Sequence, residues 1–231
     1  MQKNVKPRPA PAAARERAEI KGSPEIAASA DTAPQQAIDN ALPIRLVVLD
    51  GLAAAPIADR LSTRMPGAPI TVFDNLEEAL GNEGPVLVVM ADAVDSLGNG
   101  LASAESAQEA LADWQATRRD VLAHQRRNRR RVTLINIALL ANTESKAWGT
   151  LAQRCNRVLA ESSDAAPAEA EMQFQVAPPF RLAAMALSLA DAETVGMLSE
   201  LDAVMLGRPE EAARSAVLAA VADLQARDQQ L

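Results

Sequence analysis

The apolar run VLVVM at residues 86–90, preceded by Pro85, constrains the fold of this chain more than any other feature. Successive residues of a strand point to opposite faces of the sheet, so a run without polar residues is apolar on both faces. Strands of this kind are typical of the middle of a parallel sheet, because crossover helices cover both of its faces. We therefore expect residues 86–90 to form a central strand.

Similar patterns predict the remaining elements. The predicted strands cover residues 44–49, 70–73, 86–90 and 132–137. Apolar residues at helical spacing predict helices over residues 53–64, 76–80, from about 103 to the arginine-rich segment, and from 148 to about 159. Strands that alternate with helices indicate βαβ units. The expected fold class is therefore α/β, with a three-layer, mostly parallel sheet of about four strands and flanking helices.

Composition divides the chain into four parts. Residues 1–42 are rich in Pro, Ala, Gln and charge, which predicts a disordered tail or, alternatively, a tether that folds on a partner. Residues 43–160 form the predicted α/β domain, and residues 161–180 have the composition of a loop. Residues 181–231 are predicted to form a helical hairpin that packs on the domain, with its break at residues 207–209.

Charge and composition disfavour several functions. The formal net charge is −7, the pI is near 4.9 and aromatic residues make up 2 %, so nucleic acid is an unlikely partner. The single cysteine, Cys155, and the single histidine, His124, supply too few ligands for a disulfide or a thiolate metal cage. No segment has the roughly 18 successive apolar residues of a membrane span, and no secretory signal is evident. We therefore expect no metal, no membrane span and a cytoplasmic location.

Two turns that follow predicted strands carry the candidate polar site. In open α/β sheets, ligands bind outside the carboxyl ends of the strands. The first turn lacks the Lys and Ser or Thr of a phosphate-binding loop, and Pro56 removes a donor, so a plain connection is favoured. In the turn at residues 91–100, helix capping by the two carboxylates is favoured over a functional site. The candidate site residues are Asp50, Gly51, Asp92, Asp95, Ser96 and Asn99.

Five arginines within six residues form the strongest local charge feature. Cations at the end of a helix oppose the negative end of its dipole, which is the simpler interpretation. The segment contains more arginines than a helix end requires, so a site for an anion or an acidic partner is the alternative. The residues of this patch are Arg126, Arg127, Arg129, Arg130 and Arg131.

Three segments follow one another between residue 85 and about residue 155: PVLVVMADAVDSLGNGL, ALADWQATRRDVL and RRRVTLINIALLANTESKAWGTL. Their order and spacing resemble the second half of a bacterial sulfotransferase-type P-loop domain. The family's Arg-Asp-Pro turn is here Ala91, Asp92 and Ala93, its serine position holds Asn99, and residues 50–55 replace its phosphate-gripping loop. The resemblance therefore implies a degenerate member of that fold, which has lost the groups that hold PAPS.

These observations favour a non-catalytic protein with a binding or accessory function. A degenerate sulfotransferase-like domain is one such protein. We expect a protein partner and no cofactor. One alternative is a glycan- or metabolite-modifying transferase that uses PAPS, in which the carboxylates of the second turn and the arginines share a pocket. The other alternative is a structural subunit of a larger assembly. Enzymatic activity is the less favoured expectation.

Overall fold

The computed structural model describes residues 42–142, 146–160 and 176–207. Its strands are β1 (Ile44–Val48), β2 (Ile70–Phe73), β3 (Val86–Met90), β4 (Val132–Asn136) and β5 (Met205–Leu206). Its helices are α2 (Ala54–Arg64), α3 (Leu76–Leu80), α4 (Ala93–Ser103), α5 (Ala107–Arg127), α6 (Ile137–Ala141), α7 (Ala147–Arg154), α8 (Pro178–Ala190) and α9 (Ala192–Val204). The predicted tail up to residue 41, the loop at residues 161–175 and the second helix of the predicted hairpin lie outside the described residues.

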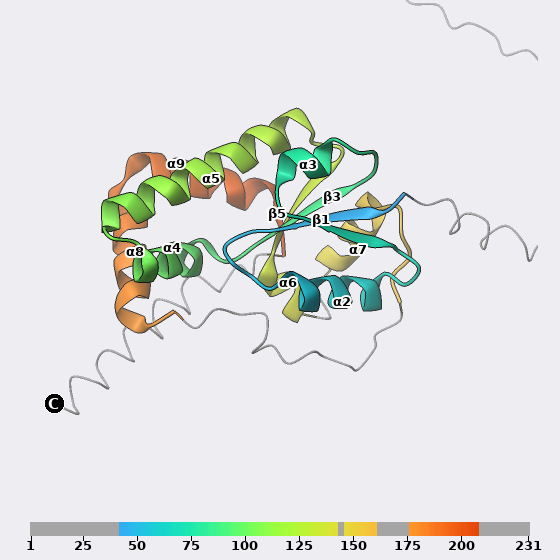
Figure 1. Ribbon diagram of the computed structural model, residues 1–231, viewed down its shortest axis with the longest axis horizontal. Coiled ribbons are helices and arrows are strands. Elements are labelled where there is room, and N and C mark those ends of the chain that lie inside the picture. Colours follow the sequence, from blue (N-terminus) through green and yellow to red (C-terminus); the bar gives the residue numbers. More distant parts are fainter. Residues whose placement is uncertain (1–41, 143–145, 161–175, 208–231) are drawn as a thin grey trace, which may run out of the picture.

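The five strands form one parallel sheet in the order β2-β1-β3-β4-β5 (Figure 1). The predicted α/β class with a parallel sheet is confirmed. This strand order is that of flavodoxin-like doubly wound folds, in which the chain turns from one side of the sheet to the other between β1 and β3. Strand β3 pairs with β1 on one side and with β4 on the other. It is therefore the central strand that the VLVVM run predicts.

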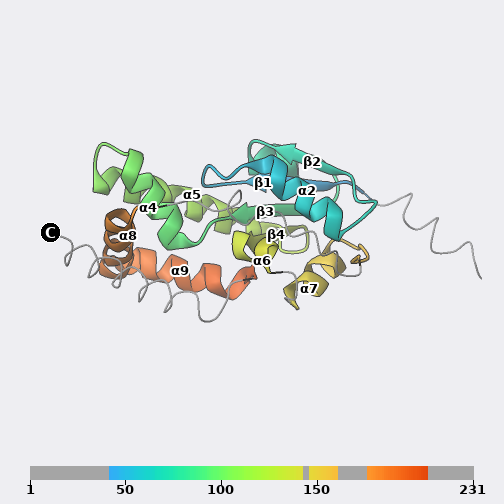
Figure 2. The ribbon, with the colours of Figure 1, turned by 90° about the horizontal axis from the view of Figure 1, so that it is seen from below.

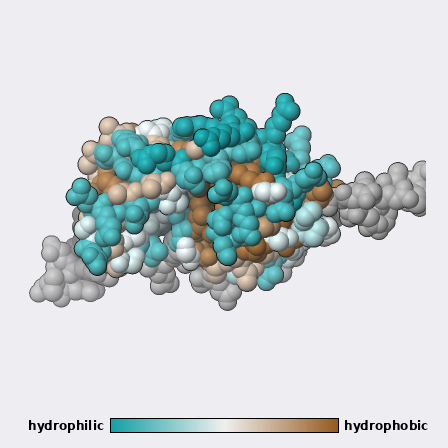
Figure 3. Space-filling model, turned by 45° about the horizontal axis from the view of Figure 1, so that its top comes forward, coloured by the Kyte–Doolittle hydropathy of each residue, from teal (hydrophilic) through white to brown (hydrophobic). Residues whose placement is uncertain are grey.

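Helices cover both faces of the sheet, as Figures 1 and 2 show. Helices α2, α6 and α7 pack on one face, and α3, α5 and α9 pack on the other. The side chains of β3 alternate between these two cores: Leu87 and Val89 belong to the first, and Val86, Val88 and Met90 to the second. All five are fully buried, and each contributes about 1.5–3 kcal/mol of transfer free energy. On the face shown in Figure 3 the surface is mainly hydrophilic, with apolar residues between the polar ones.

Helix α4 is the main correction to the sequence-based assignment, which gave residues 91–100 as a turn. Gly98, Asn99 and Gly100 have low helix propensity and are typical of turns. The helix forms nevertheless, because Asp92 caps it and Leu97 enters the core. Gly98 allows the start of α8 to approach closely, since a Cβ atom on it would lie 2.7 Å from Val176 Cγ1.

The C-terminal part also differs from the prediction. A single helix was expected from Leu182 to Leu201, but Asp191 ends α8 and caps α9, and the two helices are bent by 98°. Helix α8 begins at Pro178, inside the predicted loop, and β5 adds a fifth strand beside β4. Among the described residues no single helix is long and apolar enough to cross a membrane, although α8 and α9 together pass that test as a bent pair.

Candidate functional site

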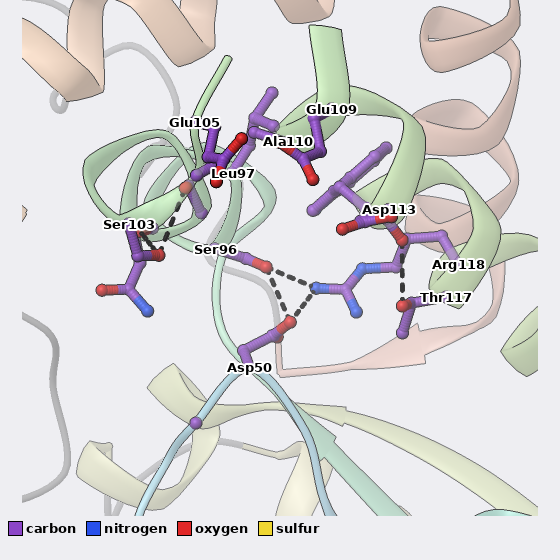
Figure 4. A pocket seen from close by; sticks show the side chains of 15 residues that line it. Asp50, Ser96, Leu97, Ser103, Glu105, Glu109, Ala110, Asp113, Thr117 and Arg118 are labelled. Carbon is purple, nitrogen blue, oxygen red and sulfur yellow. Dashed lines mark hydrogen bonds and ion pairs between the residues drawn. The ribbon is translucent and has the colours of Figure 1, made fainter. Parts of the chain in front are cut away.

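A pocket of about 480 Å³ lies at the carboxyl edge of the sheet, beside the point between β1 and β3 where the strand order reverses. We call it the switch-point pocket. Open α/β sheets bind their ligands at this position. It is lined by the β1–α2 turn, by α4, and by α5 with the link that precedes it (Figure 4): Asp50, Gly51, Ser96, Leu97, Asn99, Gly100, Ser103, Ala104, Glu105, Glu109, Ala110, Asp113, Trp114, Thr117 and Arg118.

The turn after β1 is tight and directs Asp50 toward the pocket. The N–H of Leu52 donates to the carbonyl of Leu49 at 3.2 Å, which closes a four-residue turn. Its two central residues, Asp50 and Gly51, have φ values of +63° and +71°, as in a type I′ turn. Gly adopts this conformation freely, and Asp tolerates it better than most residues. The turn that the Asp-Gly pair predicts is confirmed.

Asp50 forms a closed polar cluster with Ser96 and Arg118 (Figure 4). Its Oδ1 accepts from Arg118 Nη2 and from Ser96 Oγ, each at 2.6 Å, and its Oδ2 accepts from the Ala91 N–H at 2.9 Å. Arg118 Nη2 also donates to Ser96 Oγ at 2.8 Å. The side chains of Asp50 and Arg118 are only 7 % and 2 % exposed, so this is a buried ion pair. The Arg118 guanidinium further lies 5.3 Å from the ring centre of Trp114.

This arrangement engages both oxygens of the Asp50 carboxylate and the Ser96 hydroxyl within the protein. Asp50 is surrounded by donors, and the guanidinium neutralises the carboxylate that a general base would need. The Ser96 hydroxyl donates to that same carboxylate. The hydroxyls of Ser103 and Thr117 donate to carbonyls of their own helices, those of Asn99 and Asp113, at 3.0 Å. The hydroxyls of Ser96, Ser103 and Thr117 thus donate either to a backbone carbonyl or to a carboxylate that is paired with Arg118.

The remaining lining of the pocket is acidic. Glu105, Glu109 and Asp113 belong to it and are exposed to solvent, and Arg118 is the sole basic residue among the described residues that line it. Since Arg118 is paired with Asp50, three carboxylates remain without a neutralising charge in the lining. Within the described ranges, no group of three or more His, Cys, Asp or Glu side chains is placed to hold a metal ion.

Two buried donors in the lining have no hydrogen-bond partner among the described residues. These are Nη1 of Arg118 and Nε1 of Trp114. A buried donor without an acceptor costs about 1–3 kcal/mol. Both atoms are closed off from solvent, so an outside acceptor reaches them only after a side-chain shift.

Asp92 and Asp95 have different roles from Asp50. Asp92 accepts from the Val94 N–H at 3.0 Å and caps α4, as favoured from the sequence. Asp95 does not cap the helix but pairs with Arg181 of α8 at 3.0 Å. Burial raises the pKa of Asp95, Arg181 opposes this, and the charge of Asp92 adds to it. Ser96, a candidate site residue from the sequence, is buried in the cluster, and Asn99 lines the pocket.

The arginines of the patch differ in their partners. Arg126 forms an ion pair with Glu200 of α9. Arg131 donates to the carbonyls of Leu80, Asn82 and Gly84, and so holds the loop between α3 and β3. Arg127, Arg129 and Arg130 form no ion pair within the described part of the chain. His124 lies 3.5 Å from Asp120 on the same helix.

The patch and the polar site lie at different places. Arg126 is eight residues beyond Arg118 on α5, which corresponds to about 12 Å along the helix axis. The carbonyl of Arg131 accepts from the Val86 N–H, at the amino end of β3, whereas Asp50 contacts Ala91 beyond its carboxyl end. A five-residue strand spans about 16 Å. The structure therefore does not bring these arginines and the carboxylates into one pocket.

Arg118 and Trp114 are site residues that sequence reasoning did not select, and so are the acidic lining residues Glu105, Glu109 and Asp113. The available signal was helical spacing, because residues 114, 118, 121 and 125 fall on the face of α5 that is buried. A charged residue on a buried face requires a partner of opposite charge. Comparison with protein-family models, with curated proteins and with solved structures gives no significant match for this chain.

Proposed function

We propose that this chain is a non-catalytic binding or accessory protein that takes its ligand in the switch-point pocket. The proposal rests mainly on the closed cluster of Asp50, Ser96 and Arg118. The cluster occupies the carboxyl end of β1, where sheets with this strand order bind their ligands. Its hydrogen bonds are made within the protein. The pocket beside it, by contrast, stays accessible and is lined by three carboxylates that form no ion pair among the described residues.

The pocket chemistry supports a ligand that carries an amine together with oxygen acceptors. The carboxylates of Glu105, Glu109 and Asp113 favour a cationic group by electrostatic attraction. Arg118 Nη1 and Trp114 Nε1 belong to lining residues, lack acceptors and are closed off from solvent, so a ligand oxygen reaches them after a side-chain shift. Amino sugars combine these features, and so does a lysine side chain with its backbone carbonyl in a partner protein.

The same pocket is poorly suited to the phosphate groups of PAPS. A phosphate at the start of α2 would lie near the Asp50 carboxylate, and like charges repel. Pro56, the third residue of that helix, has no N–H to donate, and Ala53 provides no side-chain cap. The PAPS-dependent transferase is therefore the weaker candidate.

Calorimetric titration of the full chain with glucosamine, glucose and PAPS tests the proposal. Glucosamine carries an ammonium group at C2 where glucose carries a hydroxyl, and the two sugars share their other oxygens. Glucosamine is therefore expected to bind, and glucose to bind at least about tenfold more weakly. Glu109→Gln should weaken glucosamine binding, because it removes one carboxylate and keeps the side-chain length. Asp59→Asn, on the exposed side of α2, is the matched control and should have no effect.

Two results would contradict the proposal. Transfer of the sulfonate group of PAPS to glucosamine or glucose would show that the protein is an enzyme. Equal binding of glucose and glucosamine, unchanged by Glu109→Gln, would show that the acidic lining does not select the ligand.

A further inference from the structure

A second cavity, of about 300 Å³, lies at the amino edge of the sheet. We call it the amino-edge arginine pocket. It is lined by Leu42, Pro85, Arg130, Arg131, Arg154, Cys155 and Asn156, which come from the segments before β1, β3 and β4 and from the end of α7. None of these described lining residues is acidic. Three guanidinium groups thus surround a cavity at the edge opposite to the switch-point pocket.

The fold fixes the arginines of this pocket from two sides. Helix α7 ends in a Schellman motif: Arg157 N–H donates to the Ala152 carbonyl at 2.8 Å, and Asn156 N–H donates to the Gln153 carbonyl at 3.1 Å. Asn156 has a φ of +52°, in the left-handed region that this motif needs. On the other side, Arg131 is held by the carbonyls between α3 and β3.

Most of the positive charge of this edge has no ion-pair partner within the described residues. Arg130 and Arg154 form no ion pair there and are exposed to solvent. Behind Arg131, against Gly84, lies Arg45, which is 5 % exposed and whose Nη1 has no hydrogen-bond partner among the described residues. Burial lowers the pKa of Arg45, the charge of Arg131 adds to this, and Glu83 opposes it. A bound anion would offset this accumulation of charge.

We propose that the amino-edge arginine pocket binds the phosphate groups of a small phosphorylated molecule. Guanidinium groups recognise phosphate and carboxylate through paired N–H donors. A tetrahedral phosphate offers acceptors in several directions, which suits arginines that approach from two segments, whereas a carboxylate offers one plane. No aromatic residue occurs among the described lining residues, so the recognition resides in the phosphate rather than in a nucleobase.

Titration of the full chain with inorganic pyrophosphate tests this inference, with succinate at the same ionic strength as the comparison. Pyrophosphate should raise the melting temperature and succinate should not. Arg130→Ala and Arg154→Ala should each weaken pyrophosphate binding about tenfold or more, because each removes a charge-assisted hydrogen bond. Both residues are exposed, so the fold should persist, and circular dichroism checks this.

Arg129→Ala is the matched control, since Arg129 is exposed, adjacent in sequence and absent from the cavity lining. It should change pyrophosphate affinity less than about twofold, because it contributes a solvent-screened charge and no contact in the cavity. Equal losses in Arg129→Ala and Arg154→Ala would overturn the proposal, because they would indicate general attraction to a basic surface. Equal binding of succinate would overturn the assignment to phosphate.

A vesicle-binding assay distinguishes a free phosphorylated molecule from a lipid headgroup as the ligand. If the ligand is a small soluble molecule, the protein should not co-sediment with phosphatidylcholine vesicles that contain phosphatidic acid. Binding to these vesicles without binding of pyrophosphate would contradict the proposal. Glu109→Gln, at the opposite edge, should leave pyrophosphate binding unchanged and so distinguishes this site from the switch-point pocket.

Discussion

Arg118 donates to the Asp50 carboxylate at 2.6 Å across 68 positions of sequence, and both side chains are almost fully buried. The pair joins the end of β1 to the middle of α5, and Ser96 extends it to α4. Three elements that line the switch-point pocket are therefore held by one ionic cluster. Its removal should change both the stability of the fold and the shape of the pocket.

Asp50→Asn should destabilise the protein by about 3–5 kcal/mol, because it leaves the charge of Arg118 buried without a counter-charge. Asn also tolerates the positive φ of this position, so backbone strain does not confound the result. Urea denaturation followed by circular dichroism measures the effect.

The control is a double-mutant cycle with Arg118→Met, which keeps an unbranched apolar stem beside Trp114. Asp50→Asn combined with Arg118→Met should cost less than the sum of the two single substitutions, since neither charge then remains buried alone. Additive losses would show that the two residues stabilise the fold independently.

Gly207 should not tolerate a side chain. It follows β5 with a φ of +85°, and a Cβ atom there would lie 2.2 Å from Leu139 Cβ in α6. Gly207→Ala is therefore expected to lower the free energy of unfolding by about 1–3 kcal/mol from the clash, and by about a further 1–2 kcal/mol from the backbone conformation.

Gly149 provides a control with the opposite sign. It lies inside α7, where an added Cβ atom meets nothing within 4 Å. Gly149→Ala should stabilise the protein by about 0.5–1 kcal/mol, because Ala loses less conformational entropy in a helix. Equal effects of the two substitutions in urea denaturation would contradict this assignment of Gly207.

The strands and most helices were predictable because their residues repeat a local pattern. The runs at residues 70–73 and 86–90 correspond to β2 and β3 without any shift. Helix α4 was not predictable in this way, because its glycines favour a turn until α8 packs against Gly98. The two residues of β5 are too few to form a pattern, and their position follows from pairing with β4.

The candidate site was predictable only in part. Asp50 and Ser96 were selected from their positions after predicted strands, where α/β folds bind ligands. The partner that determines their chemistry, Arg118, is distant in sequence, and its contact depends on the angle at which α5 crosses the sheet edge. Arg154 and Asn156 likewise join Arg130 and Arg131 only through the tertiary fold.

Asp191 should make stability fall at acidic pH. Its carboxylate accepts from the N–H and the hydroxyl of Thr194, with a further hydrogen bond from Gln115, and these bonds lower the pKa of Asp191 below its ordinary value of 3.8. A lowered pKa in the folded state contributes stability that is present above the ordinary value and is lost as pH falls below it.

Asp191→Asn tests this contribution, because Asn is also a good helix cap but does not titrate in this range. Urea denaturation between neutral pH and pH about 2–3 should show a smaller loss of stability in the variant than in the wild type. Identical pH profiles would exclude Asp191 as a source of the acid sensitivity.

Cys155 should react slowly as long as the protein is folded. Burial raises the pKa of its thiol from 9.0 to about 12, although Arg157 and Arg154 oppose the shift. At pH 8 the thiolate fraction is therefore about a thousandfold below that of an ordinary thiol, and alkylation by iodoacetamide should be slower by at least that factor than in urea-unfolded protein. The raised pKa also contributes stability that is complete below pH 9 and is lost as pH rises toward 12. Cys155→Ala should lack this part of the alkaline loss, and fast alkylation of the folded wild type would contradict the buried position of the thiol.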